Sequence, residues 1–224
     1  MKKTNISLGK INRDELYRYV GTPDDNVRGI IDKSEEELKI NVKPAYVWQI
    51  FDIEMATVGV LVKGTDIVLT GDSIKKHLKG CNRIAMLAAT LSSQADRLIR
   101  KYQSNNMAEA VVMDSLASVA IESVCDMAEE EIKEYMPNMF FTYRFGVGYG
   151  DLPLALEKDI ISVLQASKSI GLCVTDSNIL TPLKSVVCII GISESPMEKG
   201  QKGCTTCNMK ETCKYRKQGL NCRN

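Results

Sequence analysis

The order of strand-like and helix-like segments is the feature of this chain that most restricts its fold. Runs of β-branched and aromatic residues predict strands, and amphipathic runs with a three-to-four-residue apolar repeat predict helices. The predicted strands cover residues 46–53, 58–62, 67–69, 83–89, 140–143 and 185–192. The predicted helices cover residues 12–20, 27–38, 72–79, 93–104, 107–135 and 154–169. Because strands and helices come in blocks and do not alternate strictly, the pattern favours an α+β fold over a doubly wound sheet.

Two boundaries divide the chain. Pro44 separates two predicted N-terminal helices from the strands that follow, and the tail after residue 197 has almost no apolar residue that could build a core. We therefore predict an N-terminal helical segment at residues 1–43, a main domain at residues 44–197 and a Cys-rich tail at residues 198–224.

The charge balance excludes some partners. The chain has 29 Lys and Arg residues against 28 Asp and Glu residues, a net charge of +1, so nothing attracts it as a whole to nucleic acid or to an acidic membrane. No apolar stretch approaches the length of a membrane span, and the first ten residues lack the apolar core of a signal peptide. We expect a cytoplasmic protein that binds neither nucleic acid nor membrane.

The chain has a single histidine, His77. Catalytic triads, two-His metal sites and facial triads each need a histidine beside other specific groups, so most hydrolase mechanisms lose support. His77 closes a short predicted helix, where a partial positive charge is favourable.

Four of the eight cysteines lie in the tail, at Cys204, Cys207, Cys213 and Cys222. A Cys-x-x-Cys pair chelates one metal ion, and four thiolates can complete a zinc or iron–sulfur site. The spacing matches neither a zinc ribbon nor a bacterial ferredoxin, so a basic tail with incidental thiols is the alternative. The tail carries seven basic and two acidic residues, a net charge of +5 on a body of −4.

The other cysteines stand alone. Cys125, Cys173 and Cys188 lie in apolar stretches and are interpreted as small core residues.

The most glycine-dense segment follows the predicted strand at residues 140–143. Gly146, Gly148 and Gly150 let backbone N–H groups approach a ligand, Arg144 offers a bidentate clamp for a carboxylate, and Tyr149 an aromatic face for a base or a sulfonium. Together they suit S-adenosylmethionine. Only 74 residues follow Gly150, which argues against a Rossmann-type methyltransferase. The alternative is that Arg144 makes a strand-end salt bridge and the glycines make a turn.

The segment Arg144-Phe-Gly-Val-Gly148-Tyr149 resembles the Arg-x-x-x-Gly-Tyr motif of the reactivation domain of cobalamin-dependent methionine synthase. Residues 171–186 are similar to that family's Gly-x-x-x-Thr-x-Ser segment with its later Pro and Ser-Val, and residues 114–122 to its long helix. The resemblance covers roughly residues 80–192. It implies an activation-domain-like fold, with a mixed or antiparallel sheet and long helices. It implies cofactor contacts from Arg144, Gly146, Val147, Gly148, Tyr149 and Glu122.

The chain departs from the family's pattern at several positions. Ser118 stands where the family's helix carries a cofactor-binding carboxylate, which makes Glu122, one turn later on the same face, the candidate. Ile190 stands where the family has an aromatic residue, so that contact is expected to be absent. Asp126 continues the face of Glu122, whereas residues 129–131 look like a solvated charge run without a role.

The resemblance implies a free-standing reactivation module. The chain lacks an Asp-x-His-x-x-Gly cobalamin motif, so cobalamin would belong to a partner, a cobalamin-binding methionine synthase or a related corrinoid protein. In that family one-electron reduction of oxidised cobalamin is coupled to methyl transfer from S-adenosylmethionine. A flavodoxin or ferredoxin is a candidate partner of the basic tail. An iron–sulfur cluster in the tail could relay the electron that reactivation needs, whereas zinc would only order the tail. The competing hypothesis is an iron–sulfur or zinc accessory protein that acts through its tail.

Overall fold

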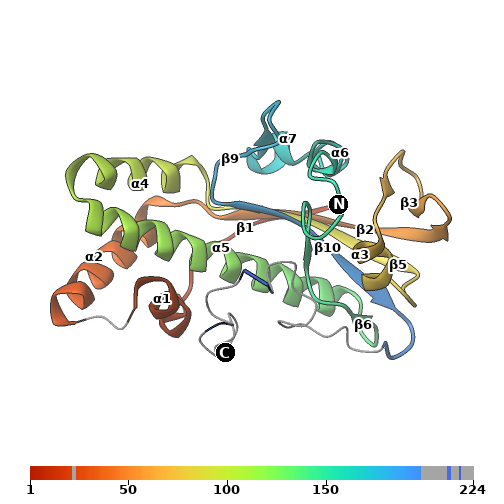
Figure 1. The fold of residues 1–224 in the computed structure, drawn as a ribbon, viewed down its shortest axis with the longest axis horizontal. Helices are drawn as coiled ribbons and strands as arrows, with labels where there is room; N and C mark the ends of the chain where they lie inside the picture. Colours follow the sequence, from red (N-terminus) through yellow and green to blue (C-terminus); the bar gives the residue numbers. More distant parts are fainter. Residues whose placement is uncertain (22–23, 198–210, 213–216, 218–224) are drawn as a thin grey trace.

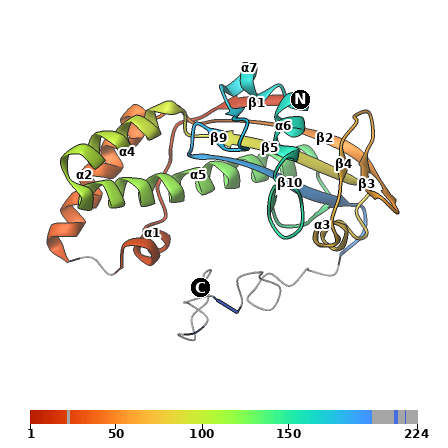
Figure 2. The same cartoon turned by 45° about the horizontal axis from the view of Figure 1, so that its top comes forward.

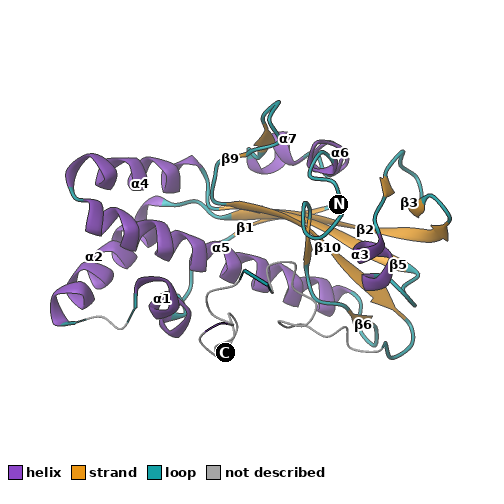
Figure 3. Cartoon of the chain, viewed as in Figure 1, coloured by secondary structure: helices purple, strands orange, loops and turns teal. Residues whose placement is uncertain are grey.

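The computed structural model describes residues 1–21, 24–197, 211–212 and 217, and shows one sheet between two groups of helices. Helices α1, α2, α4 and α5 pack on one face of the sheet, and α3, α6 and α7 pack on the other (Figure 1). Figure 3 separates the helical end of the molecule, with α1, α2, α4 and the first half of α5, from the sheet at the other end. The α+β prediction is confirmed.

Every strand pairing in the described residues is antiparallel. The main sheet has the order β4-β3-β2-β5-β10-β6, with β1 on β2 and β7 on β10, and β8 and β9 pair with each other. The strands are β1 (Lys2–Asn5), β2 (Ala45–Ala56), β3 (Gly59–Val62), β4 (Val68–Leu69), β5 (Arg83–Thr90), β6 (Phe140–Phe141), β7 (Phe145–Gly146), β8 (Cys173–Val174), β9 (Leu180–Thr181) and β10 (Ser185–Ser193). The two helices predicted in the first 43 residues are present, but β1, which pairs with β2, was not predicted.

Except for α6 and α7, the helices begin and end close to the predicted positions. They are α1 (Arg13–Val20), α2 (Asp25–Asn41), α3 (Asp72–His77), α4 (Ser93–Asn105), α5 (Met107–Tyr135), α6 (Leu156–Val163) and α7 (Ala166–Ile170). Asn106 caps α5 by accepting hydrogen bonds from the N–H groups of Ala108 and Glu109. Within the described residues, α5 included, no helix combines the length and apolarity of a bilayer span.

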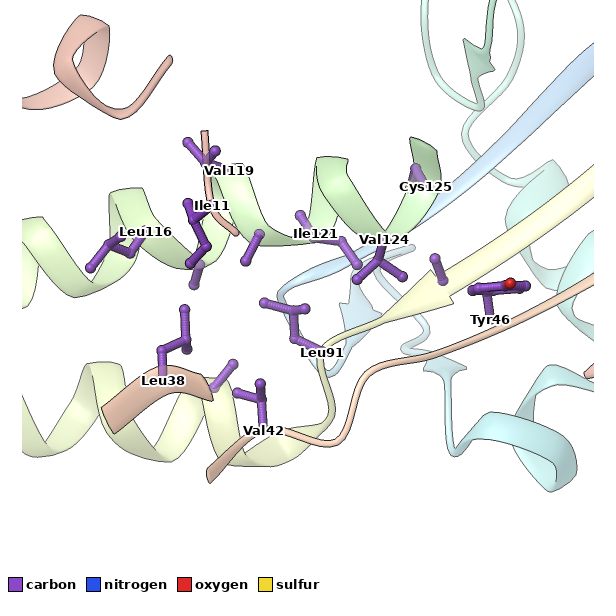
Figure 4. Close-up of a cluster of buried hydrophobic side chains, with 14 of the residues drawn as sticks. Ile11, Leu38, Val42, Tyr46, Leu91, Leu116, Val119, Ile121, Val124 and Cys125 are labelled. Carbon is purple, nitrogen blue, oxygen red and sulfur yellow. The ribbon is translucent and has the colours of Figure 1, made fainter. Parts of the chain in front are cut away.

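The central strands supply both cores. In β5 Ala85 and Leu87 face the core that contains α5, whereas Ile84 and Met86 face the core that contains α3 and α6, as the two-residue period of a strand requires. Figure 4 shows the first core, where Ile121 and Val124 of α5 lie near Leu91, just after β5.

The N-terminal segment shares this core. Ile11, Leu16, Ile31 and Leu38 are buried in the same cluster as α5, and Figure 2 shows α2, α4 and α5 side by side. The division of the chain into three segments stays a prediction.

The predicted helix at residues 154–169 is two helices, because Gln165 breaks it. Its backbone is left-handed, with φ of 47° and ψ of 35°, a conformation that costs a residue with a Cβ about 1–2 kcal/mol. Replacing Gln165 with glycine should therefore stabilise the protein by roughly 0.5–1 kcal/mol after the entropy gained by the unfolded chain is subtracted. Thermal unfolding should show a rise in Tm of about 2 °C.

Gln103→Gly is the matched control, since Gln103 is exposed in α4 and glycine disfavours a helix. The control should lower Tm. A decrease in both variants would contradict the account of the break at Gln165.

Candidate functional site

Arg144 lies between β6 and β7, and its side chain reaches across to α5. Nη1 donates to Asp126 Oδ1 at 2.6 Å and to Glu129 Oε2 at 2.9 Å, and Nη2 donates to Glu122 Oε2 at 3.0 Å. The side chain of Arg144 is only 19% exposed. Arg144 thus makes ion pairs of the kind that the structural alternative predicted, and one of its partners is Glu122, the other side chain from which the resemblance implied a cofactor contact.

The prediction that residues 129–131 form a solvated run without a role is wrong for two of the three. Glu129 binds Arg144, and Glu131 accepts hydrogen bonds from Tyr46 and from Thr4 of β1. Glu130 is exposed. Glu122, Asp126 and Glu129 are three or four residues apart and share one face of α5, a relation that a run of adjacent glutamates conceals.

The electrostatics of this site are dominated by negative charge. Burial opposes the charge of Arg144, but its hydrogen bond to Asp126 and the nearby negative charges outweigh this effect and raise its pKa. Burial, followed by the charge of Glu122, raises the pKa of Glu15. Since Asp126 and Arg144 also act on Glu15, α1 brings a fourth carboxyl group to the same site.

The glycine loop begins as a strand and ends as a turn. Phe145 and Gly146 pair with Ile189 and Cys188 of β10, and the Tyr149 N–H then donates to the Gly146 carbonyl at 3.1 Å. Gly148 and Gly150 have φ of 83° and 64°, which favours glycine at both positions. Gly146 needs no such conformation, but a Cβ there would meet no atom within 4 Å, so the space beside it is open.

Two side chains of this region were predicted to contact the cofactor. Val147 continues the pairing of β7, since its N–H donates to the Val187 carbonyl at 3.1 Å. Tyr149 is 45% exposed as a residue, and its ring centroid lies 5.4 Å from that of Phe145. Tyr149 is therefore accessible from solvent beside the loop.

Asp151 fixes the end of the glycine loop to α3, a contact that sequence reasoning missed. Its carboxylate accepts hydrogen bonds from the N–H groups of Asp72 at 2.7 Å and Ser73 at 3.0 Å. The hydrogen bonds from Ser73 and then Asp72 lower the pKa of Asp151. No local signal identified this contact, because 79 residues separate Asp151 from Asp72.

Ser118 binds a lysine that sequence reasoning also missed. Lys184 Nζ donates to Ser118 Oγ at 2.8 Å and pairs with Asp114 at 2.9 Å. Lys184 lies in the segment 171–186 that resembles the family, directly before β10. The face of α5 that carries Glu122 therefore meets Lys184 at one end and Arg144 at the other.

Two further residues have structural environments. Ile190 is fully buried in the core that contains α5. His77 is the last residue of α3, with Nε2 2.8 Å from Thr142 Oγ1 and its ring against Tyr143 and Phe145.

The cysteines differ in exposure. Cys125 and Cys188 are buried as predicted, and burial raises the pKa of Cys188 to about 12. The prediction that Cys173 is a core residue is wrong, since it is exposed at the start of β8. The predicted metal ligands Cys204, Cys207, Cys213 and Cys222 lie outside the described residues. Among the described residues no group of His, Cys, Asp and Glu side chains could hold a metal ion.

Comparisons with known proteins give a likeness of fold. No model of a protein family matches the chain, and no curated protein matches it in sequence. A solved structure described as the MetH reactivation domain bound to AdoHcy matches with a TM-score of 0.66 and 12% sequence identity, over 100% of this chain and 87% of that chain. The chain therefore has the fold of that domain, as the resemblance in sequence implied.

Proposed function

We propose that this chain binds S-adenosylmethionine beside the glycine loop and supports reductive reactivation of a cobalamin-dependent methyltransferase. The main observation behind the proposal is that Arg144 forms ion pairs with the acidic face of α5 next to that loop. It is supported by the fold, which is that of a domain solved with AdoHcy.

The donors of Arg144 suit the carboxylate of the ligand. Nη1 has both N–H groups engaged by α5, but in the described part of the chain Nε makes no hydrogen bond and Nη2 makes one. The Nε and Nη2 edge can therefore donate two parallel hydrogen bonds to a carboxylate. In this arrangement Glu122 would accept a hydrogen bond from the ligand's ammonium group.

The loop would hold the other end of the ligand. The open space beside Gly146 admits a close approach to the backbone, and the ring of the exposed residue Tyr149 would face the sulfonium or the adenine. Bound S-adenosylmethionine would supply the methyl group and leave as AdoHcy, and the cobalamin of the partner would be the nucleophile once the electron donor has reduced it by one electron. The residues of this chain would bind and orient, so the reaction needs no general base from them.

The partner would be a cobalamin-binding methionine synthase or a related corrinoid protein, with a flavodoxin or ferredoxin as electron donor. A second proposal is an iron–sulfur or zinc accessory function of the tail. It is favoured by the placement of Cys204, Cys207, Cys213 and Cys222 within one short basic segment.

Calorimetric titration of the anaerobically purified protein with S-adenosylmethionine tests the proposal. We expect saturable binding with one site per chain, and much weaker binding of methionine or adenosine alone, since each fragment makes half of the contacts. The visible spectrum and metal content of the same sample test the tail. A sample that contains metal but does not bind S-adenosylmethionine would favour the second proposal.

A further inference from the structure

Arg144 is already engaged by carboxylates of its own chain. Asp126 and Glu129 take both N–H groups of Nη1, and Glu122 takes one of Nη2. A ligand carboxylate that approaches this guanidinium therefore meets three carboxylates, of which Glu129 also pairs with Lys133 at 2.8 Å, whereas the pairs shown for Glu122 and Asp126 are with Arg144. Glu15 of α1 is a fourth carboxyl group close enough to interact with Glu122, Asp126 and Arg144.

This excess of negative charge distinguishes two forms of the ligand. S-adenosylmethionine carries a carboxylate, an ammonium and a sulfonium, and has one net positive charge. AdoHcy has a neutral thioether in place of the sulfonium and no net charge. A site with more carboxylates than cations attracts the first ligand and gives the second no electrostatic advantage.

Asp126 is the carboxylate best placed to control this balance. It makes the shortest of the three contacts with Arg144, at 2.6 Å, yet its side chain is 64% exposed. Glu129 is only 19% exposed, which leaves it little freedom to leave Arg144. Asp126 can therefore turn into solvent when a ligand carboxylate binds the Nε and Nη2 edge, and when it stays its charge competes with that carboxylate for the guanidinium.

We propose that Asp126 is a specificity-determining residue: it competes with the ligand carboxylate for Arg144, and its charge favours the sulfonium ligand over the thioether. The inference rests on the proposed function, because it assumes that S-adenosylmethionine binds at Arg144. It goes beyond that function by naming the residue that makes the site prefer S-adenosylmethionine to its demethylated product, AdoHcy.

The test is a titration of wild type, Asp126→Asn and Glu130→Gln with S-adenosylmethionine and with AdoHcy. In Asp126→Asn the affinity for AdoHcy should rise by roughly threefold to tenfold, because the ligand carboxylate no longer competes with Asp126 for Arg144. The affinity for S-adenosylmethionine should change less, because the same gain is offset by the loss of a negative charge that attracts the sulfonium. The ratio of the two affinities is the readout. Glu130→Gln removes one negative charge from the exposed side of the same helix without a hydrogen bond to Arg144, and its ratio should remain that of wild type.

The outcomes separate the inference from the function on which it rests. If wild type binds S-adenosylmethionine and Asp126→Asn has an unchanged ratio, or binds both ligands more weakly, Asp126 positions Arg144 and the inference is wrong. If neither protein binds either ligand, the proposed function fails and the inference fails with it. Circular dichroism spectra of Asp126→Asn and Glu130→Gln check that both variants are folded.

Discussion

Replacing Arg144 with alanine should weaken the binding of S-adenosylmethionine by at least roughly a hundredfold. The ligand carboxylate would lose its cation and would face Glu122, Asp126 and Glu129, and among the ion pairs of the described residues only Glu129 keeps a second cation, Lys133. A hydrogen-bonded charge pair in a partly buried site is among the strongest contacts that a small ligand makes. Calorimetric titration under the conditions used for wild type measures the loss.

Two variants make this result specific. Arg100→Ala removes an exposed arginine from α4 and should bind like wild type. Arg144→Lys keeps the charge but replaces a planar fork with a point donor, and should have intermediate affinity. If Arg144→Ala unfolds more easily but binds S-adenosylmethionine as tightly as wild type, the ion pairs with α5 are structural and the ligand site lies elsewhere.

The elements that sequence reasoning placed well are those whose signal is local. The whole of α5 was predicted from Met107 to Tyr135, because its apolar repeat is unbroken and Pro137 follows its end. The strand β5 was predicted to within one residue, since a run of apolar residues buried on both faces needs no partner to be recognised. The glycine loop was also predicted from a local signal, because the left-handed backbone at Gly148 and Gly150 favours glycine and makes the segment rich in that residue.

The features that were missed depend on partners far away in the sequence. Lys2–Asn5 is a polar segment whose strand conformation comes from its pairing with β2. The contact of Lys184 with Ser118 joins residues 66 positions apart. In the candidate site, Arg144 and Glu122 could be named from a motif and a helical spacing, whereas the engagement of Arg144 by Asp126 and Glu129 became visible only in the folded chain.

Glu157 is a buried carboxyl group outside this site. It lies in the first turn of α6 and is 5% exposed, and its Oε2 has no hydrogen-bond partner among the described residues. Burial raises its pKa from 4.5 to about 7. The folded protein therefore keeps a proton on Glu157 at pH values at which the unfolded chain has lost it.

This difference makes stability fall with rising pH. Because the folded-state pKa of Glu157 is the higher one, its favourable contribution is complete below pH 4.5, declines between pH 4.5 and about 7, and is lost above that. At 1.36 kcal/mol per pH unit, the free energy of unfolding should fall by roughly 3 kcal/mol over this range through Glu157 alone. Glu157→Gln cannot lose a proton, so its stability relative to wild type should rise by that amount between pH 4.5 and pH 8.

Urea denaturation of wild type and Glu157→Gln at several pH values measures this relative stability. A fixed cost of burying the amide shifts the difference in stability between the two proteins equally at every pH, and the titration of the groups that they share cancels in that difference. The change of the difference with pH therefore reports Glu157. Asp159→Asn, on the exposed side of the same helix, is the matched control and should show no such trend. If the difference between wild type and Glu157→Gln were constant with pH, Glu157 would be ionised in the folded protein, and a buried cation or water would have to stabilise its charge.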